Sequence, residues 1–188
     1  MQTTLDSMCT CERLHYTPDL RQRSTQEMIF EAILLQTANR LTLNTLAKCM
    51  YDGDRLGKVD TVVDLGAKLA IEWDPEYRHP EARIDADVKK TMRILEKDPE
   101  VYVVRIRVGA PRLKELESND RCIVIYVPIN TTPVKAMHAF VNAVLPILPE
   151  PHSLCLKNIP YTQDRAVIEV LNLRYACDSA FKKGMNEL

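Results

Sequence analysis

Two short apolar runs joined by a glycine turn constrain the fold of this chain more than any other feature. The runs cover residues 59–65 and 68–74, and Gly66-Ala67 joins them. Both are rich in β-branched and aliphatic residues, and such a pair across a short turn is typical of a β-hairpin. Only 5 of the 188 residues are glycine, and three of these lie between residues 53 and 66. Tight backbone geometry is therefore concentrated beside the hairpin.

The segments around the hairpin alternate between helical and extended patterns. The further predicted elements are a helix over about residues 25–38, a helix over 84–97, strands at 101–108 and 122–127, and a helix from Pro133 to about 148. Ser24 and Glu27 have the spacing of a capping box at the start of the first helix. Thr132 can cap the last helix. This order indicates an α/β fold in which helices flank a central mixed sheet.

The two later helices each have one apolar face that predicts a buried side. For the helix over 84–97 the expected core residues are Ile84, Val88, Met92 and Leu95. For the last helix they are Met137, Phe140, Val141, Val144 and Leu148. We expect the helix over 84–97 to pack against the hairpin.

Composition excludes several classes of protein. The net charge of −1 excludes a simple polycation that binds nucleic acid by bulk charge. The longest apolar runs are far shorter than the roughly 18 residues that a membrane span needs. Residues 1–6 show no secretory signal, so we expect an intracellular protein, cytoplasmic or nuclear, with no membrane partner. Its cysteines are then reduced thiols.

The N-terminal residues 1–23 are polar and aperiodic, which predicts a loose arm. Within it, Cys9, Cys11 and His15 form a C-x-C-x3-H cluster, and Cys49 is a distant candidate for a fourth ligand. Zinc sites usually carry C-x2-4-C pairs, and this chain has no second pair. We therefore expect an ordinary arm here rather than a structural zinc site.

The hairpin places several acidic side chains on one face. Side chains alternate along a strand, so Glu72 and Asp74 share a face of the second run. Asp60 and Asp64 likewise share a face of the first run. A three-residue turn is expected to pair Asp60 with Asp74, whereas a two-residue turn would separate the acids onto opposite faces. In the first register the carboxylates crowd together and repel one another unless something neutralises them.

A hard divalent cation is the natural neutralising partner for such a patch. Mg²⁺ is held by a few carboxylates together with water and phosphate oxygens. His79, Lys89 and Lys90 follow within sixteen residues of Asp74. They supply the imidazole and ammonium groups that phosphate hydrolysis needs beside a metal. The alternative is an exposed strand face whose acids are simply solvated.

The second run and the loop after it resemble a known family. Residues 71–79 read Ile-Glu-Trp-Asp-Pro-Glu-Tyr-Arg-His, similar to the motif I-E-[YWV]-D-G-x-x-x-H of the very-short-patch-repair-like endonucleases. Further similarities are Lys58-Val59-Asp60 to the family's metal-binding aspartate, Asp87-x-x-Lys90 to its D-x-x-[KR], and residues 103–107 to its v-i-R-i-R strand. The resemblance runs from about residue 24 to 127. It implies a PD-(D/E)xK nuclease-like fold with a restriction-endonuclease-like core.

The resemblance implies a metal site with identified ligands. Asp60 and Glu72 would hold Mg²⁺ or Mn²⁺, and Asp64 is a rival for Asp60 because it lies on the same face. Pro75 stands where the family has glycine, which stiffens that turn. Asp74 occupies the position of the E-x-K lysine, so a catalytic cation must come from elsewhere.

Other residues would then handle protons and charge. Asp74 would hold a metal-bound water or His79, and His79 would act as general base or acid because imidazole titrates near neutrality. Lys90 would neutralise charge that builds on the phosphate, with Lys89 as its rival. Glu27 can reach the site from the first helix, although capping explains it equally well.

Four basic residues after this site are candidates for contact with nucleic acid. Arg105 and Arg107 share one face of their strand, and Arg112 and Lys114 lie just beyond it. All four can track a phosphate backbone. The alternative for them is salt bridges with the acid-rich helix before them.

Two functions from different classes follow from these residues. The leading hypothesis is a Mg²⁺-dependent endonuclease that hydrolyses or nicks nucleic acid, with DNA as the expected partner. The alternative is a catalytically inactive nuclease-like domain with a structural or nucleic-acid-associated binding role. The predicted organisation is an arm at 1–23, a nuclease-like core at 24–130 and a helical extension at 131–188, which the resemblance does not cover.

Overall fold

The computed structural model describes residues 24, 26, 27, 29–31, 33, 34 and 59–150. The strands are β1 (Thr61–Asp64), β2 (Lys68–Pro75), β3 (Val101–Val108) and β4 (Cys122–Val127), and the helices are α4 (Ile84–Lys97) and α5 (Pro133–Val144). Short 3-10 helices cover Glu81–Arg83, Lys114–Leu116 and Leu145–Ile147. The predicted arm, its Cys–His cluster and residues 151–188 lie outside the described residues. None of the helices within the described ranges has the length and apolar character to cross a membrane.

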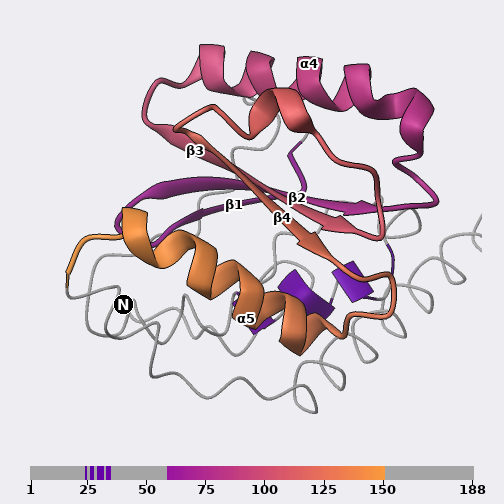
Figure 1. The fold of residues 1–188 in the computed structure, drawn as a ribbon. Coiled ribbons are helices and arrows are strands. Elements are labelled where there is room, and N and C mark those ends of the chain that lie inside the picture. Colours follow the sequence, from indigo (N-terminus) through magenta and orange to yellow (C-terminus); the bar gives the residue numbers. More distant parts are fainter. Residues whose placement is uncertain (1–23, 25, 28, 32, 35–58, 151–188) are drawn as a thin grey trace, which may run out of the picture.

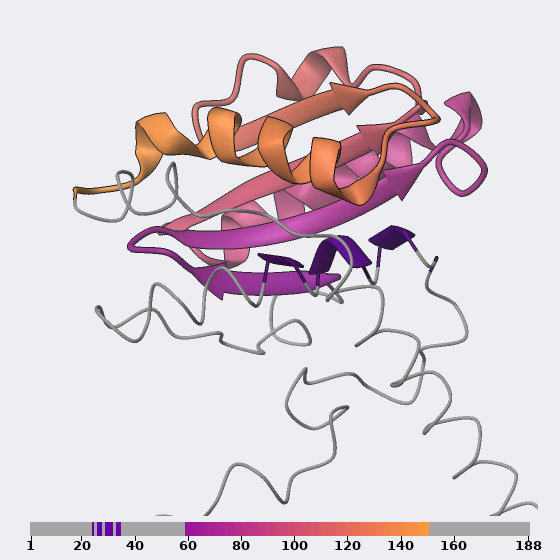
Figure 2. The ribbon, with the colours of Figure 1, turned by 90° about the horizontal axis from the view of Figure 1, so that it is seen from below.

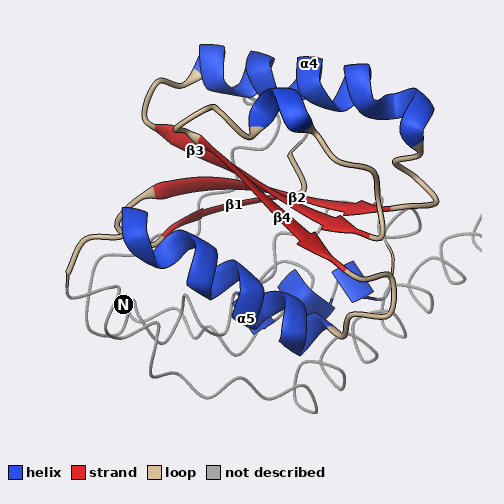
Figure 3. Ribbon diagram, in the orientation of Figure 1, coloured by secondary structure: helices blue, strands red, loops and turns tan. Residues whose placement is uncertain are grey.

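The described residues form three layers with the sheet in the middle (Figures 1 and 3). The strand order is β1-β2-β3-β4, in which β1 pairs antiparallel with β2 and the other pairs are parallel. Helix α4 covers one face, and α5 lies with the helical residues between 26 and 34 on the other (Figure 2). The predicted α/β class, a mixed sheet flanked by helices, is confirmed. The restriction-endonuclease-like core stays a prediction.

The predicted hairpin is present, but its register differs from the expected one. The turn is Leu65-Gly66-Ala67, and the pairs next to it are Asp64 with Lys68 and Val62 with Ala70. Continuing this register by one pair beyond Thr61 places Asp60 opposite Glu72 rather than opposite Asp74. The expected pairing was wrong by two residues. Because side chains alternate with a period of two, a shift of this size leaves every acid on the predicted face.

The two faces of the sheet carry different cores. The face under α5 is largely apolar and packs against Phe30 and Phe140. The centre of the Phe30 ring lies 5.2 Å from that of Trp73 and 5.9 Å from that of Phe140. The face under α4 has a smaller apolar cluster at one end, with Ala70 and Ile94 fully buried. Elsewhere this face carries buried charged side chains and, at β4, a further small apolar cluster that includes Cys122.

Helix α4 packs on the sheet with a different face from the predicted one. Its buried residues are Asp87, Thr91, Ile94 and Leu95. Met92, an expected core residue, is 39% exposed. Ile84 and Val88 are half-buried against the small cluster of Leu113, Leu116 and Cys122 instead of the hairpin. Two polar positions on α4 therefore take core places that apolar periodicity alone assigned to Val88 and Met92.

The helix starts and the α5 face agree with the sequence. The Glu27 amide donates to the Ser24 hydroxyl at 3.1 Å and the Ser24 amide donates to Glu27 at 3.3 Å, which is the predicted capping box. Thr132 accepts a hydrogen bond from the Lys135 amide at the start of α5. All five predicted core residues of the last helix are buried in the same core as the sheet, although Leu148 lies just after the helical residues. This helix, assigned by sequence to the C-terminal extension, is thus packed as part of the sheet's own core.

Gly109, just after β3, has a left-handed φ of +68°. A Cβ added there would lie 2.9 Å from the Cβ of Ile129. We expect Gly109→Ala to lower the free energy of unfolding by about 2 kcal/mol, because L-residues are disfavoured in this backbone region. Urea unfolding measures this, and an unchanged midpoint would contradict it. The double variant with Ile129→Gly separates backbone strain from the side-chain contact, since it removes the Cβ of residue 129 and leaves the left-handed φ of residue 109.

Candidate active site

Glu72 lies near the middle of β2 on the face under α4. Its side chain is almost fully buried, with 2% of the residue exposed. One carboxylate oxygen, Oε2, accepts a hydrogen bond from the Lys90 ammonium at 2.6 Å. The other oxygen, Oε1, is buried and has no hydrogen-bond partner among the described residues. Only one of the two carboxylate oxygens therefore has a hydrogen-bond partner.

Burial and charge both disfavour ionisation of Glu72. Burial, followed by the neighbouring Asp60 carboxylate, raises the pKa of Glu72 to about 8 despite the opposing charges of Lys90 and Arg105. The Asp60 carboxylate accepts a hydrogen bond from the Trp73 amide at 2.8 Å. Asp60 and Glu72 therefore come together as the sequence predicted, and they repel each other when both are ionised.

The structure separates the two rival aspartates and the two rival lysines. Asp64 lies at the hairpin turn, where it accepts a hydrogen bond from the Gly66 amide at 2.8 Å. It is four residues from Asp60 along the strand, roughly 13 Å away. Lys89 is exposed on α4, whereas Lys90 pairs with Glu72. Asp60 and Lys90 are thus the members placed beside Glu72.

Next to this pair, a network of charged side chains is buried between β2, β3 and α4. The Arg105 guanidinium binds both oxygens of Asp74 at 2.7 and 2.8 Å. Arg107 donates to Asp87 at 2.7 Å and to Asp74 at 3.3 Å. Asp74 and both arginines have no measurable exposure. The parallel register that sets Asp74 beside Arg107 and Glu72 beside Arg105 brings these groups together.

The electrostatics of this network favour its charged forms. Burial alone would lower the pKa of Arg105, but the Asp74 and Glu72 carboxylates outweigh burial and raise it. Burial would likewise raise the pKa of Asp87, yet hydrogen bonds from His79 and Arg107 and the charge of Arg105 lower it to about 2. The buried charges are therefore paired, as buried ions must be.

His79 lies between two carboxylates of this network. Its Nδ1 is 2.9 Å from both oxygens of Asp87, and its Nε2 is 3.3 Å from Asp74. Asp74 holds His79, which is one of the two roles predicted for that aspartate. Because both ring nitrogens face carboxylates, the ring fixes the loop after β2 in this arrangement.

The basic residues separate into two kinds. Arg105 and Arg107 are fully buried, so they cannot lie along a phosphate backbone, and the alternative of salt bridges is the one that the structure shows. The physical reason is that both point beneath α4, where acids neutralise them. Arg112 has a 65% exposed side chain, pairs with Glu117 and lies over the Tyr126 ring. Lys114 is exposed.

The sequence assigned no role to two residues that complete the network. Asp87 accepts from Arg107, and Thr91 accepts from Arg105 at 3.0 Å. The available signal in the sequence was a pair of polar residues four positions apart on one face of α4, followed by a strand that carries two arginines. Glu27, named as a possible contributor, is buried at the start of its helix and serves the capping box.

No group of three or more His, Cys, Asp or Glu side chains within the described ranges has the geometry of a metal site. The thiol of Cys122 is free and buried, and burial raises its pKa to about 11. Comparison of the chain with models of protein families, with curated proteins and with solved structures finds no match.

Proposed function

We propose that this chain is a divalent-metal-dependent nuclease whose site is centred on Glu72, acting on nucleic acid inside the cell. The observation that carries the proposal is the buried Oε1 atom of Glu72, which lacks a partner beside the Asp60 carboxylate. Burying a polar atom without a hydrogen bond is costly. A cation bound between Glu72 and Asp60 would give this oxygen a partner and would neutralise both carboxylates.

Mg²⁺ or Mn²⁺ fits this donor set. Asp60 and Glu72 would hold the ion, because hard cations take carboxylate oxygens and complete their shell with water and phosphate. When bound, such an ion supplies positive charge opposite a phosphate oxygen and polarises water for attack on phosphorus. Two carboxylates are few, and phosphate oxygens of the substrate supply further ligands.

The residues of the chain then divide the remaining tasks. Lys90 has a side chain that is 31% exposed, so its ammonium can turn from Glu72 toward a phosphate and stabilise charge there. His79 and Asp74 hold the loop after β2 in place and act as positioning residues. Arg112 and Lys114 lie on the surface, where they can contact the phosphate backbone.

Nicking of supercoiled plasmid DNA tests the proposal. We expect nicking with Mg²⁺ or Mn²⁺, none with EDTA, and a rate loss of about 100-fold or more for Glu72→Gln and Asp60→Asn, the scale for removing a group that orders charge in a transition state. Asp64→Asn is the matched control, because it changes an aspartate of the same strand outside the site. Nicking that survives EDTA, or an equal loss in the control, would contradict the assignment.

The alternative is a nuclease-like domain without activity, serving as a structural or nucleic-acid-binding protein. The observation that favours it is the network of Asp74, Asp87, Arg105 and Arg107, which neutralises itself without a metal. A protein that shows neither nicking nor a rise in melting temperature with Mg²⁺ or Mn²⁺ would have this role.

A further inference from the structure

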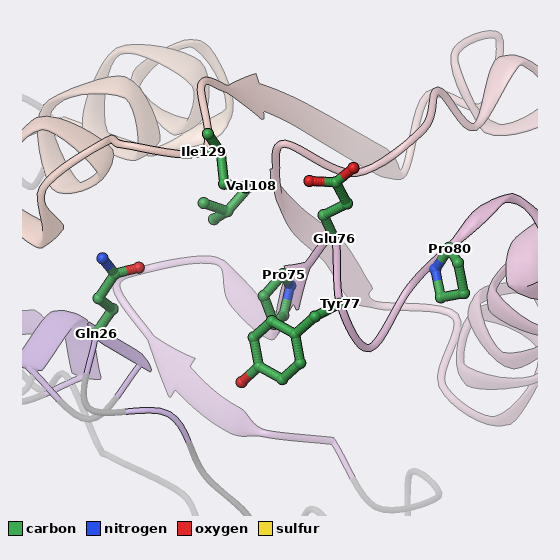
Figure 4. A pocket seen from close by; sticks show the side chains of 7 residues that line it. All are labelled: Gln26, Pro75, Glu76, Tyr77, Pro80, Val108 and Ile129. Carbon is green, nitrogen blue, oxygen red and sulfur yellow. The ribbon is translucent and has the colours of Figure 1, made fainter.

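A pocket of about 390 Å³ opens at the end of the sheet where the parallel strands finish (Figure 4). Pro75 ends β2 and Val108 ends β3, and both line it. The remaining lining residues are Gln26, Glu76, Tyr77, Pro80 and Ile129. Ligand sites have volumes of roughly 300–1,000 Å³, and in open α/β sheets they lie beyond the carboxyl ends of the strands.

The pocket combines apolar walls with one exposed aromatic ring, which carries a hydroxyl, and with an amide and a carboxylate side chain. Tyr77 is 67% exposed and Ile129 is 56% exposed. They are two of the three large apolar side chains that the described residues expose, the third being Met92 on α4. The Gln26 amide and the Glu76 carboxylate are the polar groups at the pocket (Figure 4). Such a lining suits a flat aromatic ligand that carries amino and carbonyl groups.

The loop presents Tyr77 in a fixed position although its ring is exposed. The amides of Arg78 and His79 both donate to the Pro75 carbonyl at 3.0 Å, and the Glu76 amide donates to the Val108 carbonyl at 3.0 Å. His79 is in turn held between the carboxylates of Asp74 and Asp87. The Arg78 guanidinium lies 5.6 Å from the centre of the Tyr77 ring. Binding therefore requires little further ordering of this loop.

We propose that this pocket takes an unpaired base of single-stranded nucleic acid, an inference that rests on the proposed nuclease function. The Tyr77 ring stacks on the base, Glu76 and Gln26 bond its edge, and Arg78 faces the adjoining phosphate. Pro75 is three residues beyond Glu72 on β2, roughly 10 Å along the strand. Side chains alternate along β2, so Pro75 and Glu72 point to opposite faces of the sheet, and a strand that fills both sites has to pass around the end of β2.

The charge distribution favours a single strand over a duplex. Duplex binding depends on rows of cations along the phosphates. In the described part of the chain, the two arginines of β3 form buried ion pairs with Asp74 and Asp87 and do not reach the surface. Single-strand binding depends more on stacking of bases on aromatic side chains, for which Tyr77 is placed.

Fluorescence anisotropy in EDTA tests binding without cleavage. The probes are a labelled DNA single strand, the RNA of the same sequence, and the DNA duplex. We expect the single strands to bind more tightly than the duplex, with the DNA and RNA arms showing which sugar is preferred. Tyr77→Ala should weaken single-strand binding by about 5- to 150-fold, the effect of removing one stacking ring. Tyr77→Phe should retain binding, and Met92→Ala, an exposed apolar residue elsewhere, should not change it.

The outcomes separate this inference from the proposed nuclease. Equal or tighter binding of the duplex, loss of binding in Tyr77→Phe, or no effect of Tyr77→Ala would overturn the base pocket even if the plasmid is nicked. Binding of single strands that depends on Tyr77, in a protein that cleaves neither the plasmid nor the single-stranded DNA and RNA probes with Mg²⁺ or Mn²⁺, would support the pocket and refute the nuclease. A wild-type protein that binds none of the three probes would overturn the pocket.

Discussion

Arg105→Met is expected to lower the free energy of unfolding by about 3–5 kcal/mol, the usual cost of removing one partner from a buried ion pair. The substitution leaves Asp74 in a place with no exposure and takes away its bidentate partner. Thr91 loses a donor as well. Equilibrium urea unfolding at neutral pH measures the loss. Arg105→Lys should recover only part of it, because an ammonium cannot reproduce the two-pronged contact.

Arg112→Met provides the matched control for this prediction. Arg112 also binds a carboxylate, but its side chain is 65% exposed, and solvent screens exposed pairs so that they contribute little to stability. Equal effects of the two substitutions would show that the network of Asp74, Asp87, Arg105 and Arg107 does not hold α4 on the sheet.

A second large effect is expected from pH, through Glu72. In the folded protein its pKa is raised from the ordinary 4.5 to about 8, so between these values the folded state binds more protons than the unfolded state. Stability must then fall as pH rises across this window. The full pKa shift corresponds to a loss of at most about 5 kcal/mol in the free energy of unfolding across this window. Urea unfolding in EDTA at a series of pH values measures the slope.

Two comparisons assign this slope to Glu72. Glu72→Gln removes the titrating group and should flatten the profile between pH 5 and 8. A divalent ion bound to Glu72 competes with the proton, so Mg²⁺ should stabilise the wild-type protein more at pH 8 than at pH 6. A wild-type profile without a fall in this window, or one that Glu72→Gln leaves unchanged, would disprove the burial of this carboxylate as a protonated acid.

Most of the fold could be predicted because its signals are local. Gly66 between two β-branched runs, the capping pair Ser24 and Glu27, and Thr132 with Pro133 each act within a few residues. The hairpin register was less accessible, since it depends on the conformation of the turn. The face of α4 was misjudged because Asp87 and Thr91 occupy core positions. Two arginines 14 to 20 residues further along the chain, together with His79, make these positions tolerable.

The part of the candidate site that depends on local signals could also be predicted from the sequence. The alternation of side chains along β2 correctly placed Glu72 and Asp74 on one face. The choice of Asp60 over Asp64 required the hairpin register, and the choice of Lys90 over Lys89 required the orientation of α4. Arg105 and Arg107 were read as surface cations because their sequence context does not reveal that α4 covers them. The pocket at Tyr77 joins the first helix to three strand ends, and no local pattern brings those segments together.

The charges that hold α4 on the sheet are different residues from those of the proposed site. The residues that fasten α4 to the sheet are Asp74, Asp87, Arg105 and Arg107, whereas Glu72 hydrogen-bonds to Lys90 outside that set. Under the proposed function, a single substitution at Glu72 would therefore remove the reaction over evolutionary time and leave the fold intact. A reversal at the same codon would restore it. Loss of the proposed activity would then need a change at one carboxylate, whereas the four fastening charges have to be retained together.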